Sequence, residues 1–225
     1  MESREIMGKE IDLLVNYPKT KRNLEERVAS KTEADRAIAR QFGREFFDGD
    51  RNHGYGGFNY FARFWQPVVP TFQAHWGLSK DSSILDVGCA KGFMMHDLTQ
   101  IIPGITVKGI DISEYAIENA MEDMKPHVQV ANATSLPFQD KSFDVTISIN
   151  SIHNLGREEC GKALQEIERV SRKGSFITVD AYRNEEEKKR MYAWNLTAKT
   201  IMSVDEWVEF FKEVGYTGDY FWFIP

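Results

Sequence analysis

The fold of this chain is decided by the stretch Ile84-Leu85-Asp86-Val87-Gly88-Cys89-Ala90-Lys91-Gly92-Phe93. Its first four residues are typical of a buried strand, and the glycine-punctuated turn that follows opens a helix. Gly88 and Gly92 have no Cβ, so the backbone there can approach a ligand closely. The next apolar run, residues 105–112, carries the carboxylate of Asp111 near its end, where a bound ribose is expected in a nucleotide-binding fold. The stretch therefore predicts a site for a nucleotide-type cofactor.

The spacing of the glycines distinguishes between three kinds of cofactor site. A phosphate-binding loop ends in Gly-Lys-Ser/Thr, whereas this chain has Lys91-Gly92-Phe93. A dinucleotide site uses Gly-x-Gly-x-x-Gly to seat a pyrophosphate on a helix N-terminus, whereas here Gly88-x-Ala90-x-Gly92 follows Asp86. The Asp86 carboxylate would repel a pyrophosphate but suits a ligand with an ammonium and a sulfonium group. The pattern resembles motif I of the class I S-adenosylmethionine (SAM)-dependent methyltransferases, with Ala90 in place of the middle glycine.

Residues 80–182 as a whole resemble the type 11 members of that class. In the resemblance, Asp111 takes both ribose hydroxyls and Ile112 packs on the adenine. The segment Asn132-Ala133-Thr134-Ser135-Leu136-Pro137-Phe138 resembles the one that covers the adenine, with Asn132 accepting from the adenine amino group. The implied cofactor is SAM, and the implied binding residues in the core are Asp86, Gly88, Cys89, Ala90, Gly92, Asp111, Ile112, Asn132, Ala133 and Asn150. The alternative is a tight turn without a ligand, with Asp111 as a helix N-cap.

Strands and helices alternate along residues 71–225, which predicts an α/β, Rossmann-like core. Such a core is a doubly wound, mostly parallel sheet with helices on both faces. Ser203 with Glu206 predicts the start of the last helix, and Gly215 its end. Class I methyltransferases normally finish with a hairpin that has one antiparallel strand, but only one strand is evident here, at 216–225. Either residues 194–201 supply the missing strand or the sheet is shortened.

Residues 1–70 precede the core and are predicted to form a helical and aromatic cap. The segment 53–65 holds many aromatic residues among glycines, which favours either a lid over the site or simple packing against the core. If it is a lid, Arg63 is expected to meet the carboxylate of SAM and Tyr55 to flank the cofactor. His53 is then a candidate for the acceptor side of the site.

His153 is the candidate general base, because it lies just after the fourth strand, and ligands of open α/β sheets collect beyond the carboxyl ends of strands. An ordinary histidine pKa of ~6.5 suits proton removal near neutral pH. The alternative is a histidine that only holds the loop. Asn154 is either a helix cap or a contact to the acceptor, and Tyr182 and Arg183, after the fifth strand, are candidates to bind an acidic or hydroxylated acceptor.

Composition narrows the remaining possibilities. The chain has 225 residues, a net charge of -6 and 42% hydrophobic residues, which predicts one domain with elaborations and disfavours a general nucleic-acid surface. No apolar run approaches the ~20 residues of a membrane span, and the start does not resemble a signal peptide. Cys89 and Cys160 do not make a disulfide framework, and no cluster has the spacing of metal ligands. We therefore expect a cytoplasmic protein without a metal site.

Together these observations predict a SAM-dependent methyltransferase whose acceptor is a small, polar and hydroxylated molecule. Two alternatives stay open: a SAM-binding protein without catalytic activity, and a methyltransferase that acts on RNA or protein.

Overall fold

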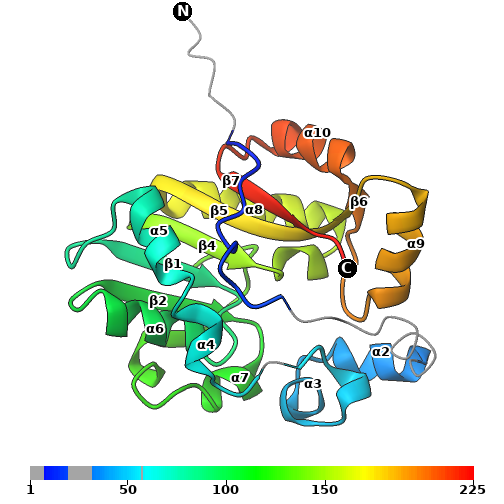
Figure 1. The fold of residues 1–225 in the computed structure, drawn as a ribbon, viewed down its shortest axis with the longest axis horizontal. Coiled ribbons are helices and arrows are strands. Elements are labelled where there is room, and N and C mark those ends of the chain that lie inside the picture. The colour runs from blue at the N-terminus through cyan, green and yellow to red at the C-terminus, as the bar shows by residue number, and fades with distance from the viewer. Residues whose placement is uncertain (1–7, 20–31, 57) are drawn as a thin grey trace, which may run out of the picture.

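The computed structural model describes residues 8–19, 32–56 and 58–225; residues 1–7, 20–31 and 57 of the predicted cap lie outside the described residues. The described chain forms one seven-stranded sheet of order β3-β2-β1-β4-β5-β6, with β7 also paired to β5 (Figure 1). All of its described strand pairs are parallel. The strands are β1 (Ser83–Val87), β2 (Thr106–Asp111), β3 (Val128–Val130), β4 (Phe143–Ile149), β5 (Ser171–Tyr182), β6 (Met202–Ser203) and β7 (Asp219–Phe223).

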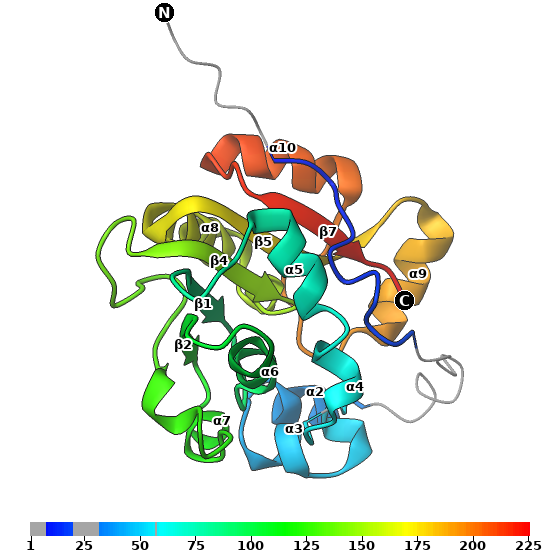
Figure 2. The same ribbon diagram turned by 60° about the vertical axis from the view of Figure 1, so that its left-hand side comes forward.

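Helices cover both faces of the sheet, as predicted. Helices α5 (Val69–Trp76) and α6 (Phe93–Ile101) pack on one face, and α8 (Arg157–Val170) and α10 (Val204–Val214) pack on the other (Figures 1 and 2). Helix α7 (Glu114–Glu118) follows β2, and α9 (Glu185–Trp194) follows β5. The architecture is the predicted Rossmann-like, doubly wound sheet.

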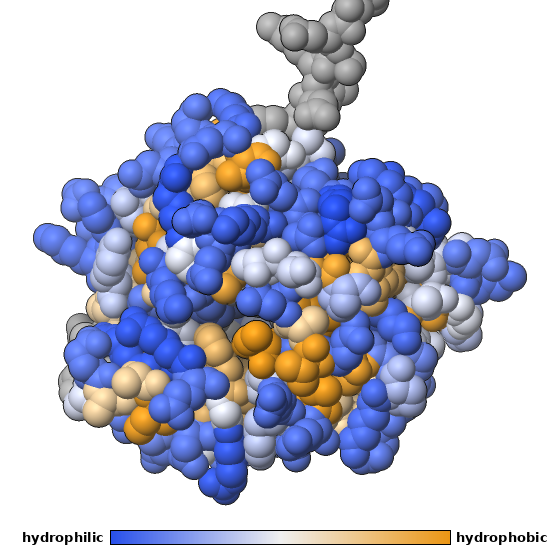
Figure 3. Space-filling view, turned by 180° about the vertical axis from the view of Figure 1, so that it is seen from behind, coloured by the Kyte–Doolittle hydropathy of each residue, from blue (hydrophilic) through white to orange (hydrophobic). Residues whose placement is uncertain are grey.

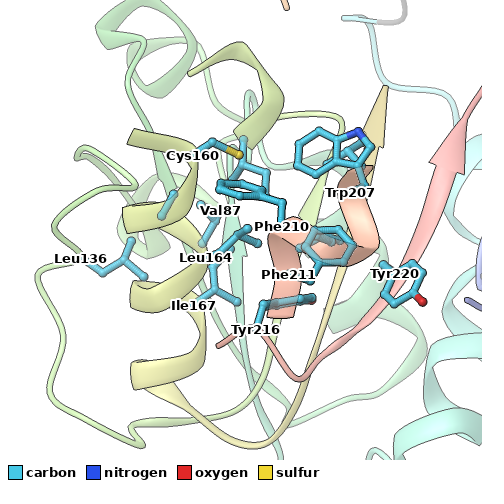
Figure 4. Packing of buried hydrophobic residues seen from close by; sticks show 14 of the residues in the cluster. Val87, Leu136, Cys160, Leu164, Ile167, Trp207, Phe210, Phe211, Tyr216 and Tyr220 are labelled. Carbon is cyan, nitrogen blue, oxygen red and sulfur yellow. The ribbon is translucent and has the colours of Figure 1, made fainter. Parts of the chain in front are cut away.

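The larger part of the core lies between the sheet, α8 and α10. The apolar stripe of α8, which includes Leu164 and Ile167, faces the aromatic side chains Phe210 and Phe211 of α10 (Figure 4). Burying a side chain of this size contributes about 1.5–3 kcal/mol. Because this layer anchors β4 and β5 from behind, it fixes where their carboxyl ends lie.

Predicted capping signals account for several helix ends. The Ser203 hydroxyl accepts from the N–H of Glu206 at 3.2 Å, and Gly215 ends α10 with φ 74°. Helix α8 instead runs directly into β5, which begins at Ser171. The Ser171 hydroxyl donates to the Ile167 carbonyl at 2.6 Å, which ties this helix end to the new strand.

The edge of the sheet differs from the sequence expectation. Residues 195–201 form no strand, so that alternative for the missing strand is wrong. The final strand β7 runs parallel to β5, and its outer edge is paired with the N-terminal segment. The N–H of Ile11 donates to the Tyr220 carbonyl at 2.9 Å, and the N–H of Tyr220 donates to the Lys9 carbonyl at 3.1 Å. The N-terminal segment therefore covers an edge that would otherwise be open to pairing with another chain.

The cap consists of α2 (Glu33–Ala39), α3 (Arg44–Asp48), the 3-10 turn η1 (Arg51–His53) and α4 (Ala62–Trp65). Helix α3 lies next to α7, and α2 lies next to α3, at the lower end of the molecule (Figures 1 and 2). A third hydrophobic cluster joins Phe46 and Phe47 of α3 to Ala116 of α7 and Leu196. The cap is therefore packed against the core, and α5 crosses the boundary at residue 70 that the sequence suggested.

Candidate functional site

A cleft of about 1700 Å³ lies between the cap and the carboxyl ends of the strands. In the space-filling view, the face opposite that of Figure 1 has a central hollow bordered by hydrophobic residues (Figure 3). The volume exceeds the ~300–1,000 Å³ of an ordinary small-molecule pocket, so the cleft has room for two ligands side by side. Most of the candidate site residues line it: Tyr55, Arg63, Asp86, Gly88, Cys89, Ala90, Asp111, Ile112, Asn132, Ala133, Asn150, His153, Asn154 and Arg183.

The turn after β1 adopts a left-handed backbone at three alternate residues. Gly88, Ala90 and Gly92 have φ values of 87°, 49° and 78°. A Cβ at Gly88 would lie 2.1 Å from the Ser151 hydroxyl, so a side chain is excluded there. Ala90 holds a conformation that usually needs glycine, which explains why the related motif has glycine at that position. Gly92 faces Met124 and does not line the cleft, so its place in the site is that of a turn residue.

Asp111 holds this turn against the end of β2. Its carboxylate accepts from the backbone N–H of Ala90 at 2.8 Å and of Ser113 at 2.9 Å. Burial raises the pKa of Asp111, while these hydrogen bonds act in the opposite direction. The side chain also lines the cleft, so the same carboxylate fixes the turn and faces a ligand.

Asp86 is the second buried acid at the head of the cleft. Burial, together with the neighbouring Asp111 charge, raises the pKa of Asp86 to about 8. Within the described part of the chain, no basic side chain pairs with either carboxylate; the partners of Asp111 are backbone N–H groups. Two buried acids without a cation are costly to ionise, and a positively charged ligand would compensate for that cost.

These features fit SAM. The buried acid Asp86 suits a ligand with ammonium and sulfonium groups, and the carboxylate of Asp111 suits ribose hydroxyls. Next to Asp111, the side chain of Ile112 is 54% exposed and lines the cleft, so it offers an apolar surface on which a base can pack.

Two polar residues predicted to bind the cofactor, Asn132 and Asn150, form hydrogen bonds with neighbouring side chains. The side-chain oxygen of Asn132 accepts both from the N–H and from the hydroxyl of Thr134, each at 3.0 Å. Both lone pairs of that oxygen are thus used. Asn132 can therefore offer its amide N–H₂ group to a ligand, whereas we expected from the sequence that it would offer the oxygen. Asn150 has φ 52°, and its side-chain oxygen accepts from the Thr178 hydroxyl at 2.9 Å. Left-handed residues other than glycine are concentrated at binding sites.

His153 lies in the 3-10 turn η3 (Ile152–Asn154), directly beyond β4, and is buried. Its Nδ1 accepts from the backbone N–H of Asp180 at 3.1 Å, and its Nε2 lies 3.7 Å from the Asp180 carboxylate. Burial lowers the pKa of His153, against the opposing effect of Asp180. The imidazole is therefore neutral at pH 7, with the proton on Nε2.

Of the three candidate site residues in the cap, Tyr55 and Arg63 line the cleft and His53 does not. The Tyr55 hydroxyl accepts from the N–H of Leu196 at 2.8 Å, and its ring stacks on Trp194, so it links the cap to the loop after α9. Arg63 lies over the ring of Phe64 at 4.9 Å and is exposed at the cleft. His53 does not line the cleft, because its ring lies between Asp35 and Glu45, at 3.3 and 3.4 Å.

The two candidate acceptor-binding residues after β5 also differ, because only one of them lines the cleft. Arg183 lines the cleft and has long ion pairs to Glu10 and Glu187, at 3.9 and 3.8 Å. Tyr182 does not line it, because its hydroxyl is directed to Glu206 of α10 at 3.4 Å.

Three further residues, Asp48, Asp180 and Lys199, were not found from the sequence. The Lys91 ammonium lies 2.7 and 2.8 Å from the Asp48 carboxylate oxygens, and the Tyr115 hydroxyl donates to the same group at 2.7 Å. Asp180 and Lys199 both line the cleft beside His153. Asp180 interrupts the apolar end of β5, a signal of the kind that marked Asp111; Asp48 and Lys199 carry no local signal.

The described residues contain no group of three or more side chains arranged to hold a metal ion. Among them, no helix combines the length and the apolar character needed to cross a bilayer.

Comparison with known proteins identifies the family. Residues 78–215 match the model of a methyltransferase domain family, and the chain belongs to that family. A tRNA (carboxymethyluridine(34)-5-O)-methyltransferase of Arabidopsis thaliana is 31% identical over 66% of this chain and 39% of its own length. The O-methyltransferase resE of Aspergillus sclerotiorum is 30% identical over 61% of this chain and 56% of its own length.

The solved structure of the MccD protein is similar to this chain with a TM-score of 0.53 and 25% identity, over 64% of this chain and 68% of MccD. The chain spans less than two thirds of the length of the curated relatives that it matches.

Proposed function

We propose that this protein transfers a methyl group from SAM to a hydroxyl of a small polar acceptor. The observation that carries the proposal is the pair of buried acids, Asp86 and Asp111, at the head of the cleft. No basic side chain of the described residues forms an ion pair with either of them. Family membership and two relatives named as methyltransferases of oxygen atoms agree with it. SAM supplies a methyl group on a positively charged sulfur, which is already activated for displacement.

The chain's own residues then have three tasks. Asp86 faces the cationic end of the cofactor, Asp111 faces the ribose, and Ile112 faces the adenine. Arg63 is the candidate for the cofactor carboxylate. The cap and the strand ends enclose the reacting groups and exclude water. Alignment of two reactants in such a site can lower the barrier by about 7–11 kcal/mol.

Binding is tested first, by thermal unfolding with SAM, its demethylated product S-adenosylhomocysteine, and NAD. At about 100 times Kd a ligand stabilises by roughly 2.7 kcal/mol, which corresponds to about 5–10 °C for a chain of this size. We expect a shift with the first two compounds only. Asp111→Asn removes a charge-assisted hydrogen bond of about 1.5–3 kcal/mol and should weaken SAM binding about 10- to 150-fold. A shift with NAD and none with SAM would end the proposal.

His153 is proposed as the base that removes the acceptor proton, a contribution of about 10²–10⁴-fold. Its Nδ1 lone pair is engaged with the Asp180 N–H, so an acceptor hydroxyl must replace that contact for the proton to move. The competing role is to hold the loop. His153→Asn separates the two, because the asparagine oxygen can still accept from the Asp180 N–H but is not a base.

If His153 is the base, His153→Asn and His153→Ala both lose at least 100-fold in kcat while binding SAM as the wild type does. If it only holds the loop, His153→Asn stays within a few-fold of the wild type and His153→Ala alone is impaired. The first alternative function, a SAM-binding protein without catalysis, predicts binding of SAM with no methylated product from any acceptor.

A further inference from the structure

Lys199 lies where the methyl acceptor is expected, although it is 46 residues from His153 in sequence. The backbone N–H groups of Lys199 and Thr200 both donate to the His153 carbonyl, each at 3.0 Å. The Thr200 hydroxyl donates to the Leu155 carbonyl at 2.7 Å. These bonds hold residues 199–200 against the turn beyond β4, and the Lys199 side chain lines the cleft.

The charge of Lys199 is not compensated. Its side chain is exposed, and no carboxylate of the described residues pairs with it, in contrast to the Lys91–Asp48 pair. Five other exposed basic residues line the same cleft, although the protein has a net charge of -6: Lys19, Arg40, Arg51, Arg63 and Arg183. Of the five acids that line it, Asp86, Asp111 and Asp180 are buried, Asp12 is half-buried and Glu159 is exposed. The accessible part of the cleft is therefore basic, which favours an anionic ligand.

Asn154 supplies a second, independent observation. Its side-chain oxygen is buried and has no hydrogen-bond partner among the described residues, and the residue lines the cleft next to His153. A buried acceptor without a donor is unfavourable, and a ligand hydroxyl that donates to it would remove that cost.

We infer that Lys199 and Asn154 form the acceptor subsite, and that the acceptor carries an anionic group, such as a carboxylate, together with a hydroxyl. Lys199 holds the anion, and Asn154 accepts from the hydroxyl when the acceptor binds. Because one hydroxyl donates one hydrogen bond, it must turn from Asn154 to His153 for its proton to be removed. The Asp180 carboxylate beside His153 repels the anion, so the acceptor enters with its hydroxyl toward His153 and its anion toward Lys199. The inference rests on the proposed function, because it places the acceptor beside the transferred methyl group.

Pairs of small molecules that differ only in having a carboxylate or an amide test whether the subsite prefers an anion. Affinities of 4-hydroxybenzoate and 4-hydroxybenzamide, and of lactate and lactamide, are measured by calorimetry or ligand-observed NMR on the full chain saturated with S-adenosylhomocysteine. We expect at least one acid to bind tenfold or more tightly than its amide. Lys199→Gln should abolish the preference, Lys199→Arg should keep it, and Lys199→Glu should reverse it. Lys189→Gln is the matched control, because Lys189 is exposed on α9 and does not line the cleft.

Asn154 is tested with benzoate, which lacks the hydroxyl. The wild type should bind 4-hydroxybenzoate more tightly than benzoate, and Asn154→Leu should bind the two equally. The inference is overturned if acids and amides bind equally, if the preference survives in Lys199→Gln, or if no acid binds at millimolar concentration. An unchanged thermal shift with S-adenosylhomocysteine in each variant shows that the fold and cofactor site persist. Loss of that shift in the wild type would instead count against the proposed function.

Discussion

Asp86 shows how a single residue can report on the ligand. Its pKa of about 8 lies far above the ordinary 3.8, so folding of the ligand-free protein binds a proton between these values. Its contribution to stability is therefore fully present below pH 4 and is lost as the pH rises through 8. At pH 7 the carboxyl is mostly protonated, and a cation beside it lowers its pKa.

SAM binding should therefore release a proton from Asp86 near pH 7, and the release should disappear near pH 9, where the group is already ionised. Calorimetric titration in buffers of different ionisation enthalpy measures the number of protons. Asp86→Asn is the comparison, because it removes the titrating group and keeps the shape, so the difference between the two proteins isolates Asp86. Equal proton release from both would show that Asp86 does not face the cation.

Single residues differed in how well the sequence predicted them. Gly88, Asp86 and Asp111 could be found because a turn with a close approach and a carboxylate at a strand end leave local signals. Lys199 could not, since its place beside His153 is set by hydrogen bonds across the fold. We expected His53 in the site because it lies at the start of the aromatic segment in sequence. In the structure its ring lies instead between two carboxylates of the cap.

At the level of elements, the cap is attached to the cofactor turn through the ion pair of Lys91 and Asp48, whose side chains are 9% and 29% exposed. The Lys91 side chain bridges the Asp48 carboxylate of α3 and the Phe58 carbonyl. The opposite side of the cap is held by Tyr55, which accepts from the backbone N–H groups of Leu196 and Thr197. The cap thus spans the cleft from the turn after β1 to the loop after α9.

Lys91→Met should release the first of these attachments. We expect a loss of about 1–3 kcal/mol in the free energy of unfolding, together with weaker SAM binding and faster proteolysis within the cap. The control is Lys162→Met on α8, whose ammonium pairs with Glu158 at 2.8 Å on the exposed surface and should change stability by no more than about 0.5 kcal/mol. Urea denaturation and limited trypsin digestion measure both effects. Similar results for the two variants would mean that the Lys91–Asp48 pair does not hold the cap.

Elements with local signals were predicted well. The strands that flank the cofactor turn, the start of α10 at Ser203 and its end at Gly215 follow from apolar runs and capping residues. The direction and partner of β7 did not follow, because an apolar run predicts a strand but not whether its neighbour is parallel or antiparallel.

For the whole molecule, residues 8–19 connect the edge of the sheet to the face covered by α5 and α6. After the bridge to Tyr220, the chain places Leu13, which is 2% exposed, in the cluster that also holds Phe72 and Phe176. The same stretch then carries Leu14, Tyr17 and Lys19 to the cleft. The N-terminal segment therefore belongs to the folded core and to the walls of the site at once.

If so, an N-terminal substitution should act as a core substitution. Leu13→Ala should lower the free energy of unfolding by about 2–5 kcal/mol, the range for a buried leucine. Val15→Ala, two residues further on and 53% exposed, should stay within about 0.5 kcal/mol. Denaturant unfolding of both variants gives the comparison. Because Leu13 also anchors the chain that covers β7, its loss should expose the edge of that strand and promote self-association, which sedimentation at increasing concentration would detect. A Leu13→Ala protein as stable and as monodisperse as Val15→Ala would show that the segment only rests on the surface and that β5 and β7 complete the sheet without it.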